Sequence, residues 1–192
     1  MNNSSTGGYL TPAASPAPLE GQALVNFLQA WIVGITGLPG QFVRPRWQPE
    51  PPNIPDATVD WLAFGIMSRD ATPYAAEIHV SGSPSYNEIR RHEDLNILAT
   101  IYGPNADKTV SLLREGMQLA QNREALTAVN MGLINSGRAI VTSELIKEKW
   151  AYRVDFNFSI RRQIVYDFPV LDLASANGAV ATDYLNETIS VT

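Results

Sequence analysis

The sequence contains no cysteine, and this absence removes several kinds of chemistry at once. Without thiols the chain has no disulfide bonds, no thiolate metal ligands and no cysteine nucleophile. Charged residues are also scarce, at 17% of the chain, whereas an average soluble protein has about a quarter. Because so few charges can hardly coat a whole monomer surface, we expect part of the surface to be buried against other chains.

Long apolar runs and a basic character are missing as well. The longest apolar stretch, around AWIVGITGL, is too short and too rich in glycine to span a bilayer. The first residues lack the basic and then apolar pattern of a signal peptide. The net charge of −5 disfavours non-specific binding to nucleic acid. We therefore expect no membrane partner and no tight DNA binding from a chain of 192 residues, of which 45% are apolar.

Residues suited to catalysis or metal binding are few. The two histidines, His79 and His92, lie near carboxylates and could form a metal cluster if their strands are neighbours. Two half-exposed strand histidines explain the same pattern more simply. The chain has no nucleophile elbow and no phosphate-binding loop. We expect no catalytic residues, no metal and no cofactor, and so no enzyme, with a metal-dependent enzyme using His79 and His92 as the remote alternative.

Apolar periodicity predicts an α+β fold. Helical spacing predicts a helix over 19–36, a second helix of about sixteen residues after Gly103-Pro104, and a shorter helical piece in REALTAVNMG. Strands are predicted over 59–69, 74–82, 86–103, 137–145 and 150–166, with a last short strand in ETISVT. The fold class that follows is an antiparallel β-sheet with helices packed on one face, an extended Pro-rich arm and flexible termini.

The strand over 150–166 has the clearest pattern in the chain. Its even-numbered residues are mainly aromatic or branched, and its odd-numbered residues from 153 to 163 are polar. Side chains alternate between the two faces of a strand. We therefore expect Val154, Phe156 and Phe158 all to point inward against the helices.

The stretch VRPRWQPEPPNIPD, Val43–Asp56, has five prolines in fourteen residues. No helix and no central strand tolerates that spacing, so it predicts an extended arm within 41–58. A stiff arm loses little entropy when it docks, and Trp47 offers a large anchor, while Arg44 and Arg46 offer donors for carboxylates. The candidate contacts to a neighbouring subunit are Arg44, Arg46, Trp47, Pro49, Pro51 and Pro52.

Two other interpretations of this arm stay open. It could cross its own domain and cover an edge of the sheet, an interpretation as well supported as docking on a neighbour. Arg46, Pro49 and Pro52 also fit the spacing of an SH3 ligand, a pattern that arises often by chance.

Composition divides the chain into three parts. Residues 1–18 are mainly Ser, Gly, Ala and Pro without charge, which predicts a flexible tail that only a partner orders. Residues 19–171 are predicted to form one α+β domain that includes the arm. Residues 172–192 carry acidic residues and neither Lys nor Arg, and are predicted to be a separate acidic extension.

Four quoted segments together resemble the neck or tail terminator family of tailed bacteriophages. They are TGLPGQFVRPRWQPEPPNIP, VDWLAFGI, HEDLNILATIYGPNA and EKWAYRVDFNFSIRRQIVYDFPVL. The resemblance spans about Leu24 to Leu171. Its specific parts are the Trp-Gln-Pro-x-Pro-Pro arm, the YGPNA junction and the closing RRQIV strand, none of which is a catalytic motif.

The resemblance implies a structural virion protein that forms a homo-hexameric ring. Such a ring ends the tail tube, joins it to the head-proximal connector or adaptor protein, and lets genomic DNA pass through its lumen. The implied partners are further copies of this chain, the tail tube protein, the connector and, as a further candidate, the sheath. The implied location is the neck or tail of a virion assembled in the host cytoplasm. A head-proximal adaptor, a tube protein or a baseplate protein is the alternative within the same class.

Overall fold

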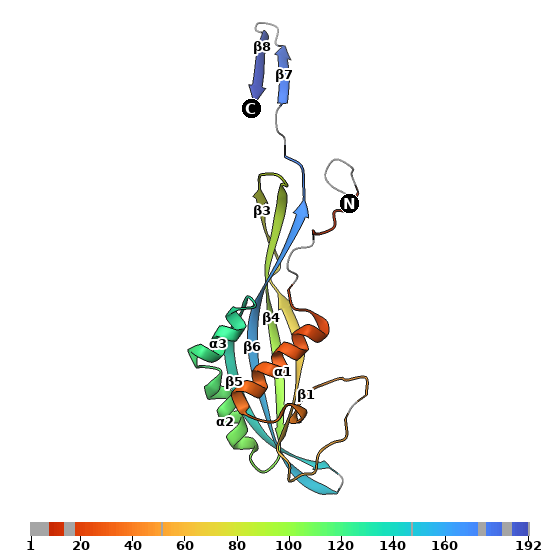
Figure 1. Ribbon diagram of the computed structural model, residues 1–192, viewed down its shortest axis with the longest axis vertical. Coiled ribbons are helices and arrows are strands. Elements are labelled where there is room, and N and C mark those ends of the chain that lie inside the picture. The colour runs from red at the N-terminus through yellow and green to blue at the C-terminus, as the bar shows by residue number, and fades with distance from the viewer. Residues whose placement is uncertain are drawn as a thin grey trace. The chain divides into compact units, whose positions relative to one another are not determined.

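The structure is a computed structural model, and it describes residues 8–13, 18–50, 52–146, 148–172, 176–181 and 186–191. Its elements follow the order α1 (Gly21–Thr36), η1 (Gly40–Phe42), β1 (Val43–Pro45), β2 (Trp61–Ala71), β3 (Ala76–Val80), β4 (Tyr86–Tyr102), α2 (Ala106–Gly116), α3 (Ala120–Thr127), β5 (Met131–Ile146), β6 (Lys149–Pro169), β7 (Ala176–Ala181) and β8 (Asn186–Val191). Figure 1 labels them along the ribbon. The predicted α+β class is confirmed.

The described residues form two compact units. The larger contains 18–75 and 91–164, and the smaller contains 76–90 with the described parts of 8–13 and of the chain from 165 onward. Strands β4 and β6 contribute residues to both units. The three-part division by composition stays a prediction.

Six strands form one sheet in the order β1-β2-β4-β6-β5, with β3 pairing with β4. The pairs β2/β4, β3/β4 and β5/β6 are antiparallel, but β1 runs parallel to β2. The prediction of a purely antiparallel sheet is therefore wrong at this edge. Parallel neighbours need a long crossover to bring the chain back to the same end, and residues 46–60 supply it here.

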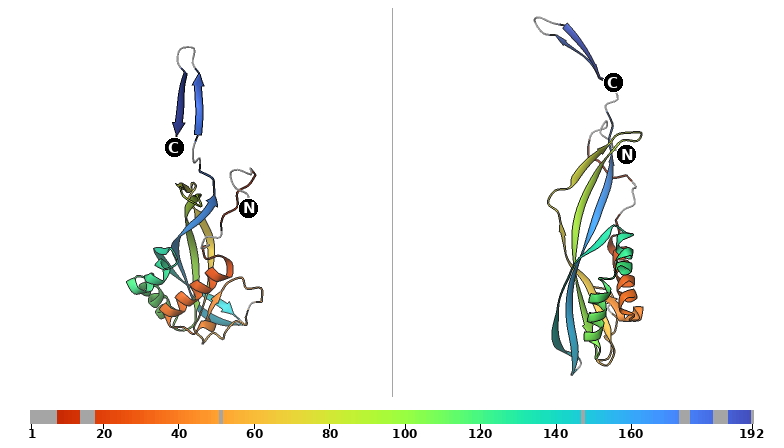
Figure 2. Two further views of the ribbon diagram at one scale, coloured as in Figure 1. Left: turned by 45° about the horizontal axis from the view of Figure 1, so that its top comes forward. Right: turned by 90° about the vertical axis from the view of Figure 1, so that its left-hand side faces the viewer.

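The helices cover one face of the sheet in the larger unit, as the right-hand view of Figure 2 shows. Leu24, Leu28 and Trp31 on α1 are buried. The Trp31 ring centroid lies 6.2 Å from that of Phe158, and its Nε1 donates to the Asn122 carbonyl at 2.8 Å. One indole thus joins α1 to both α3 and β6.

The predicted face of β6 is confirmed over its central part. Val154, Phe156 and Phe158 are 0%, 0% and 2% exposed, as strict alternation requires. Trp150 has the same parity but is 72% exposed, so the helices do not cover this end of the strand. Arg162 also lies on the inward parity and is only 2% exposed.

The helical region after β4 differs from its prediction. The chain forms α2 and α3 with a break at 117–119 instead of one long helix and a short piece, and Ala120 is exposed at the start of α3. The second helix ends at Thr127, and β5 already begins at Met131, six residues before the predicted strand. Two register irregularities against β6 interrupt the alternation of β5 before Ala139. They hide its first part from a period-two analysis.

The two ends of the chain are described in part. Strands β7 and β8 form their own two-stranded sheet, and β8 overlaps the last strand predicted in ETISVT. The flexible tail predicted for 1–18 falls largely on 1–7 and 14–17, which lie outside the described residues. Within the smaller unit the Ala13 amide donates to the Asp167 carbonyl at 2.7 Å. None of the described helices has the length and apolar character needed to cross a membrane.

Candidate interaction surface

The Pro-rich arm starts from a well-anchored base on α1. Gln29 donates from Nε2 to the carbonyls of Gly40 (3.2 Å) and Val43 (2.7 Å). Val43 is fully buried, and β1 then pairs in parallel with β2, with Val43 opposite Leu62 and Pro45 opposite Phe64. The start of the arm therefore occupies an edge of the sheet of its own subunit. This agrees with the interpretation in which the arm covers a sheet edge of its own domain.

The two arginines of the arm contact their own subunit. Arg44 donates from Nε to the Gln41 carbonyl (2.8 Å) and from Nη1 to the Asn53 carbonyl (2.7 Å), and its guanidinium lies 5.7 Å from the Trp61 ring centroid. Arg44 thereby holds the returning part of the arm close to its start. Arg46 donates from its backbone amide to the Phe64 carbonyl (2.7 Å) and from Nη2 to the Thr100 hydroxyl.

Trp47 occupies an unusual position directly after Arg46. Its φ of 57° lies in the left-handed region, which bulky residues rarely adopt, so the contacts around it fix its backbone. A Cβ placed on Gly65 would lie 2.7 Å from Cζ3 of Trp47 and 3.0 Å from its Cη2. The indole therefore rests on the bare backbone of β2 at Gly65, while 69% of the residue stays exposed.

The described prolines beyond Trp47 lie at the surface. Pro49 and Pro52 are exposed, and Pro51 is outside the described residues. Gln48 donates from Nε2 to the Pro45 carbonyl at 2.9 Å, which closes a turn around Trp47. The structure assigns no helix or strand to the described residues between Pro45 and Trp61.

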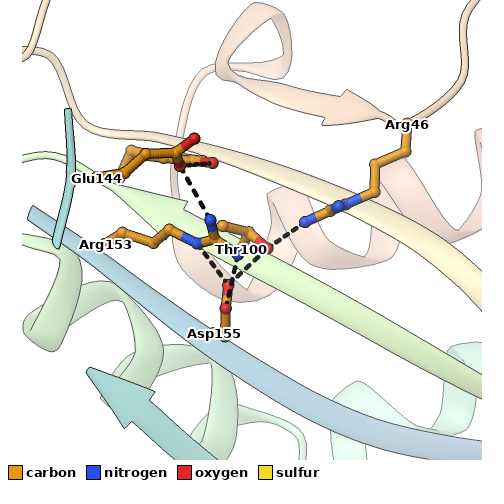
Figure 3. A network of polar contacts seen from close by, with 6 residues as sticks. Arg46, Thr100, Glu144, Arg153 and Asp155 are labelled. Atoms are coloured by element: carbon orange, nitrogen blue, oxygen red, sulfur yellow. Dashed lines mark hydrogen bonds and ion pairs between the residues drawn. The ribbon is translucent and has the colours of Figure 1, made fainter. Parts of the chain in front are cut away.

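A polar network connects the arm to the face of the sheet that the helices leave open (Figure 3). Thr100 on β4 accepts from Arg46 and donates to Asp155 Oδ1 at 2.8 Å. Arg153 donates to Asp155 from Nε (3.0 Å) and Nη2 (2.7 Å), and to Glu144 on β5 from Nη1 (2.9 Å). The chain of contacts therefore links Arg46, which directly follows β1, to β4, β6 and β5.

The electrostatics of this network favour its charged groups. Burial raises the pKa of Asp155, but hydrogen bonds from Arg153 and Thr100 outweigh it and hold the pKa below its ordinary value. The hydrogen bond to Asp155 is the main cause that raises the pKa of Arg153 further above its ordinary value. Burial raises the pKa of the Tyr102 hydroxyl, which donates to Glu144 at 3.1 Å, to about 12. The network is therefore a fixed set of paired charges at neutral pH.

The two histidines lie on different strands and have different partners. His79 on β3 contacts Asn87 Oδ1 through Nδ1 (2.8 Å) and Asp172 Oδ1 through Nε2 (2.9 Å). The backbone carbonyl of His92 on β4 accepts from the Thr72 amide at 2.9 Å. Within the part of the chain that the structure describes, no group of three His, Asp or Glu residues could hold a metal ion.

Several residues of this region were not identified from the sequence. Arg162 donates to Glu93 Oε2 (2.6 Å), the Leu19 carbonyl (2.7 Å) and Glu20 Oε1 (2.8 Å), and so fixes the entry to α1. The sequence did offer one signal for Arg162. Its even number places it among the inward-facing residues of an alternating strand, and a charge on the buried face needs a partner. Gly65 gave a weaker signal, as a glycine inside an apolar strand often marks close approach of another segment.

A family model for the phage neck terminator protein matches residues 22–183. The matched region includes the arm, α2, α3 and every strand of the six-stranded sheet. No curated protein matches the sequence. Because the match covers most of the chain and agrees with the resemblance found in its motifs, this chain belongs to the phage neck terminator protein family and is a structural protein of the virion neck or tail.

Proposed function

We propose that this chain forms a closed homomeric ring, with six copies as implied by the resemblance, that ends the tail tube and joins it to the head-proximal connector. The ring stops tube growth because its outer surface differs from the end of the tube, so that the connector binds there in place of a further tube subunit. DNA passes through its lumen. The net charge of −5 favours passage without tight binding, because a basic lumen would hold the phosphate backbone.

The observation that carries this proposal is the position of Trp47. The residue is 69% exposed, yet its ring rests on Gly65 and its backbone is held on both sides by Arg46 and Gln48. A large side chain that is already ordered loses little entropy when a partner covers it. Tryptophan is also among the residues that contribute most to protein interfaces. Trp47 therefore has the properties of an anchor for a neighbouring subunit.

A ring makes such an anchor effective. A closed ring repeats one head-to-tail contact around its axis, so each subunit offers the anchor once and receives it once. Loss of the indole weakens every contact in the ring, by about 2 kcal/mol or more per interface if Trp47 is a hot spot.

The first test is the particle mass of Trp47→Ala beside wild type, measured by multi-angle light scattering across a range of concentrations. We expect a folded variant, by circular dichroism, that shifts toward smaller species and fails to cap tails. Tyr74→Ala is the matched control, because Tyr74 is 90% exposed and lies outside the arm. A folded Trp47→Ala with unchanged particle mass and unchanged capping would contradict the anchor.

A second variant changes Gly65, on which the Trp47 ring rests, and leaves the indole intact. Gly65→Ala places a Cβ at 2.7 Å from the Trp47 ring and so displaces the anchor. We expect weaker assembly without loss of the fold. Gly132→Ala is the matched control, because a Cβ there meets no heavy atom within 4 Å. If Gly65→Ala assembles as well as Gly132→Ala, the contact with the neighbouring subunit does not require the Trp47 ring to rest on Gly65.

Electron microscopy of virions tests the location. A ring labelled through this chain is expected between the tail tube and the head connector. A ring at the distal end or along the tube would instead favour a baseplate or tube protein, and one against the head would favour an adaptor.

A further inference from the structure

The exposed apolar side chains of the larger unit include two groups beside or on its sheet. The arm patch consists of Trp47, Ile54 and Met67, which are 69%, 47% and 54% exposed. The hairpin patch consists of Val141, Leu145 and Trp150, which are 59%, 59% and 72% exposed. Exposed apolar side chains that gather in one place on a soluble subunit indicate an interaction site.

The arm patch is hollowed. Trp47 separates two open hollows of about 420 and 270 Å³. Met67 and Phe64 line the larger, and Ile54 and Trp61 line the smaller. Met67 sits at a register irregularity of β2 between Ile66 and Ser68, where the strand is not in regular pairing with β4. This surface can receive apolar side chains on both sides of the indole.

The hairpin patch lies toward the end at which β5 and β6 meet. Leu145 is opposite Trp150 in the antiparallel register, and Val141 is opposite Val154. Directly opposed residues share a face, and so do residues four apart on one strand, so all three side chains lie on the face that buries Val154. Val154 is fully buried, whereas the three patch residues are not covered by the helices.

The two patches are associated with opposite ends of the strand order. Of the arm patch, Met67 is on β2 and Trp47 follows β1 closely, whereas the hairpin patch is on β5 and β6. The turn end of the hairpin also reaches the arm of its own chain, because Lys149 Nζ lies 3.6 Å from Asp56 Oδ2. Within the described residues no strand pairs with the outer edge of β5, which is sixteen residues long. A long edge strand with exposed Val and Leu side chains is prone to uncontrolled pairing unless a partner covers it.

We infer that the hairpin patch of one copy of this chain docks into the hollows beside Trp47 of the next copy. The inference rests on the proposed ring and identifies the two halves of its repeated contact. A head-to-tail ring needs two unlike, complementary surfaces on each subunit. The hollowed apolar patch beside Trp47 and the exposed apolar patch on β5 and β6 are two such unlike surfaces. A single patch that paired with itself would close a dimer instead.

Disulfide trapping tests this pairing directly, because the natural chain has no cysteine. The double variant Met67→Cys with Leu145→Cys places one thiol in each patch and leaves both Trp47 and Trp150 intact. After mild oxidation we expect a non-reducing ladder of covalent oligomers that ends at the ring size. The two single-cysteine variants are the controls, and each is expected to run as a monomer on the same non-reducing gel, because it forms no covalent cross-links across this contact.

Three outcomes would overturn the inference. Assembled rings that yield only monomers, including monomers with an internal disulfide, would place the contact elsewhere and leave the proposed ring intact. Dimers from Leu145→Cys alone would show that the hairpin patch pairs with itself. A wild-type chain that stays monomeric at every concentration would overturn the ring and this contact together.

A mixing experiment gives a second measurement that does not depend on cysteines. Trp47→Ala impairs the arm patch, and Leu145→Asp with Trp150→Asp impairs the hairpin patch. Each variant alone should associate roughly thirtyfold more weakly than wild type. An equimolar mixture should form dimers and stop there, because only one intact contact remains between the two. A mixture that gains no dimers over the separate variants would count against unlike pairing.

Discussion

The two faces of the sheet in the larger unit follow different rules, although the same strands form both. On the face covered by the helices, β6 buries Val154, Phe156 and Phe158. On the open face the intervening residues are polar, and Arg153 and Asp155 are paired with each other. Apolar burial supplies most of the stabilisation, since it grows with the area removed from water. The paired charges keep the open face soluble and contribute much less to stability.

Arg162 interrupts this simple division. It lies on the covered face, 2% exposed, with Glu93 and Glu20 as ionic partners. A buried ion pair adds little net stability over an apolar pair, but loss of one partner leaves a buried charge. On the covered face, this ion-pair cluster therefore adds little net stability when complete, but the loss of one of its members is costly.

The largest expected effect comes from the centre of the covered face. Phe156→Ala should lower the free energy of unfolding by about 3–5 kcal/mol, because a fully buried ring leaves a cavity. Chemical denaturation followed by circular dichroism measures it. Asn157→Ala is the control on the opposite face, where Asn157 is exposed, and should change stability by less than about 0.5 kcal/mol. A loss below about 1 kcal/mol for Phe156→Ala would break the distinction between the faces.

Removal of the buried guanidinium should come next. Arg162→Ala is expected to cost about 3 kcal/mol, because Glu93 then remains largely buried without its cation. Arg162→Met combined with Glu93→Gln should recover part of this loss, since no charge is left unpaired. Thermal unfolding of both variants checks this order. A double variant less stable than Arg162→Ala would mean that the ion pair itself, and not the unpaired charge, determines the cost.

A smaller effect, confined to acid, is expected from the open face. The folded-state pKa of Asp155 lies below its ordinary value of 3.8, so its stabilising contribution is fully present above that value and is lost as the pH falls through the lowered pKa. Asp155→Asn should therefore be less stable than wild type at neutral pH, and the difference should shrink below about pH 4. Unfolding free energies between pH 2 and 7 would measure the two curves. Parallel curves over this range would contradict the assigned role of Arg153 and Thr100.

The smallest effect should come from an exposed ion pair on the same open face. Arg161 donates to Asp94 from Nε (2.7 Å) and Nη2 (2.9 Å), but the Arg161 side chain is 52% exposed. Arg161→Ala should therefore cost less than about 1 kcal/mol, and the loss should decrease further in high salt. A loss as large as that of Arg162→Ala, its neighbour on the opposite face, would contradict the comparison.

The sequence by itself determined the features that depend on local periodicity. The burial of Val154, Phe156 and Phe158, the helix of α1 and the absence of thiol chemistry all follow from residues close together in the chain. A period of two or 3.6 residues identifies which side chains share one face of a strand or helix, and it does so without reference to the segment that packs on that face. The family resemblance likewise came from the order of short segments along the chain.

Only the tertiary structure decided which distant segments meet. The Arg46 guanidinium donates to Thr100, 54 positions away, and Arg162 donates to Glu20, 142 positions away. The parallel pairing of β1, the break between α2 and α3 and the seat of Trp47 on Gly65 also depend on such encounters. Local patterns do not encode them, because the free energy of each contact depends on a partner, and on a backbone geometry, that the rest of the fold supplies.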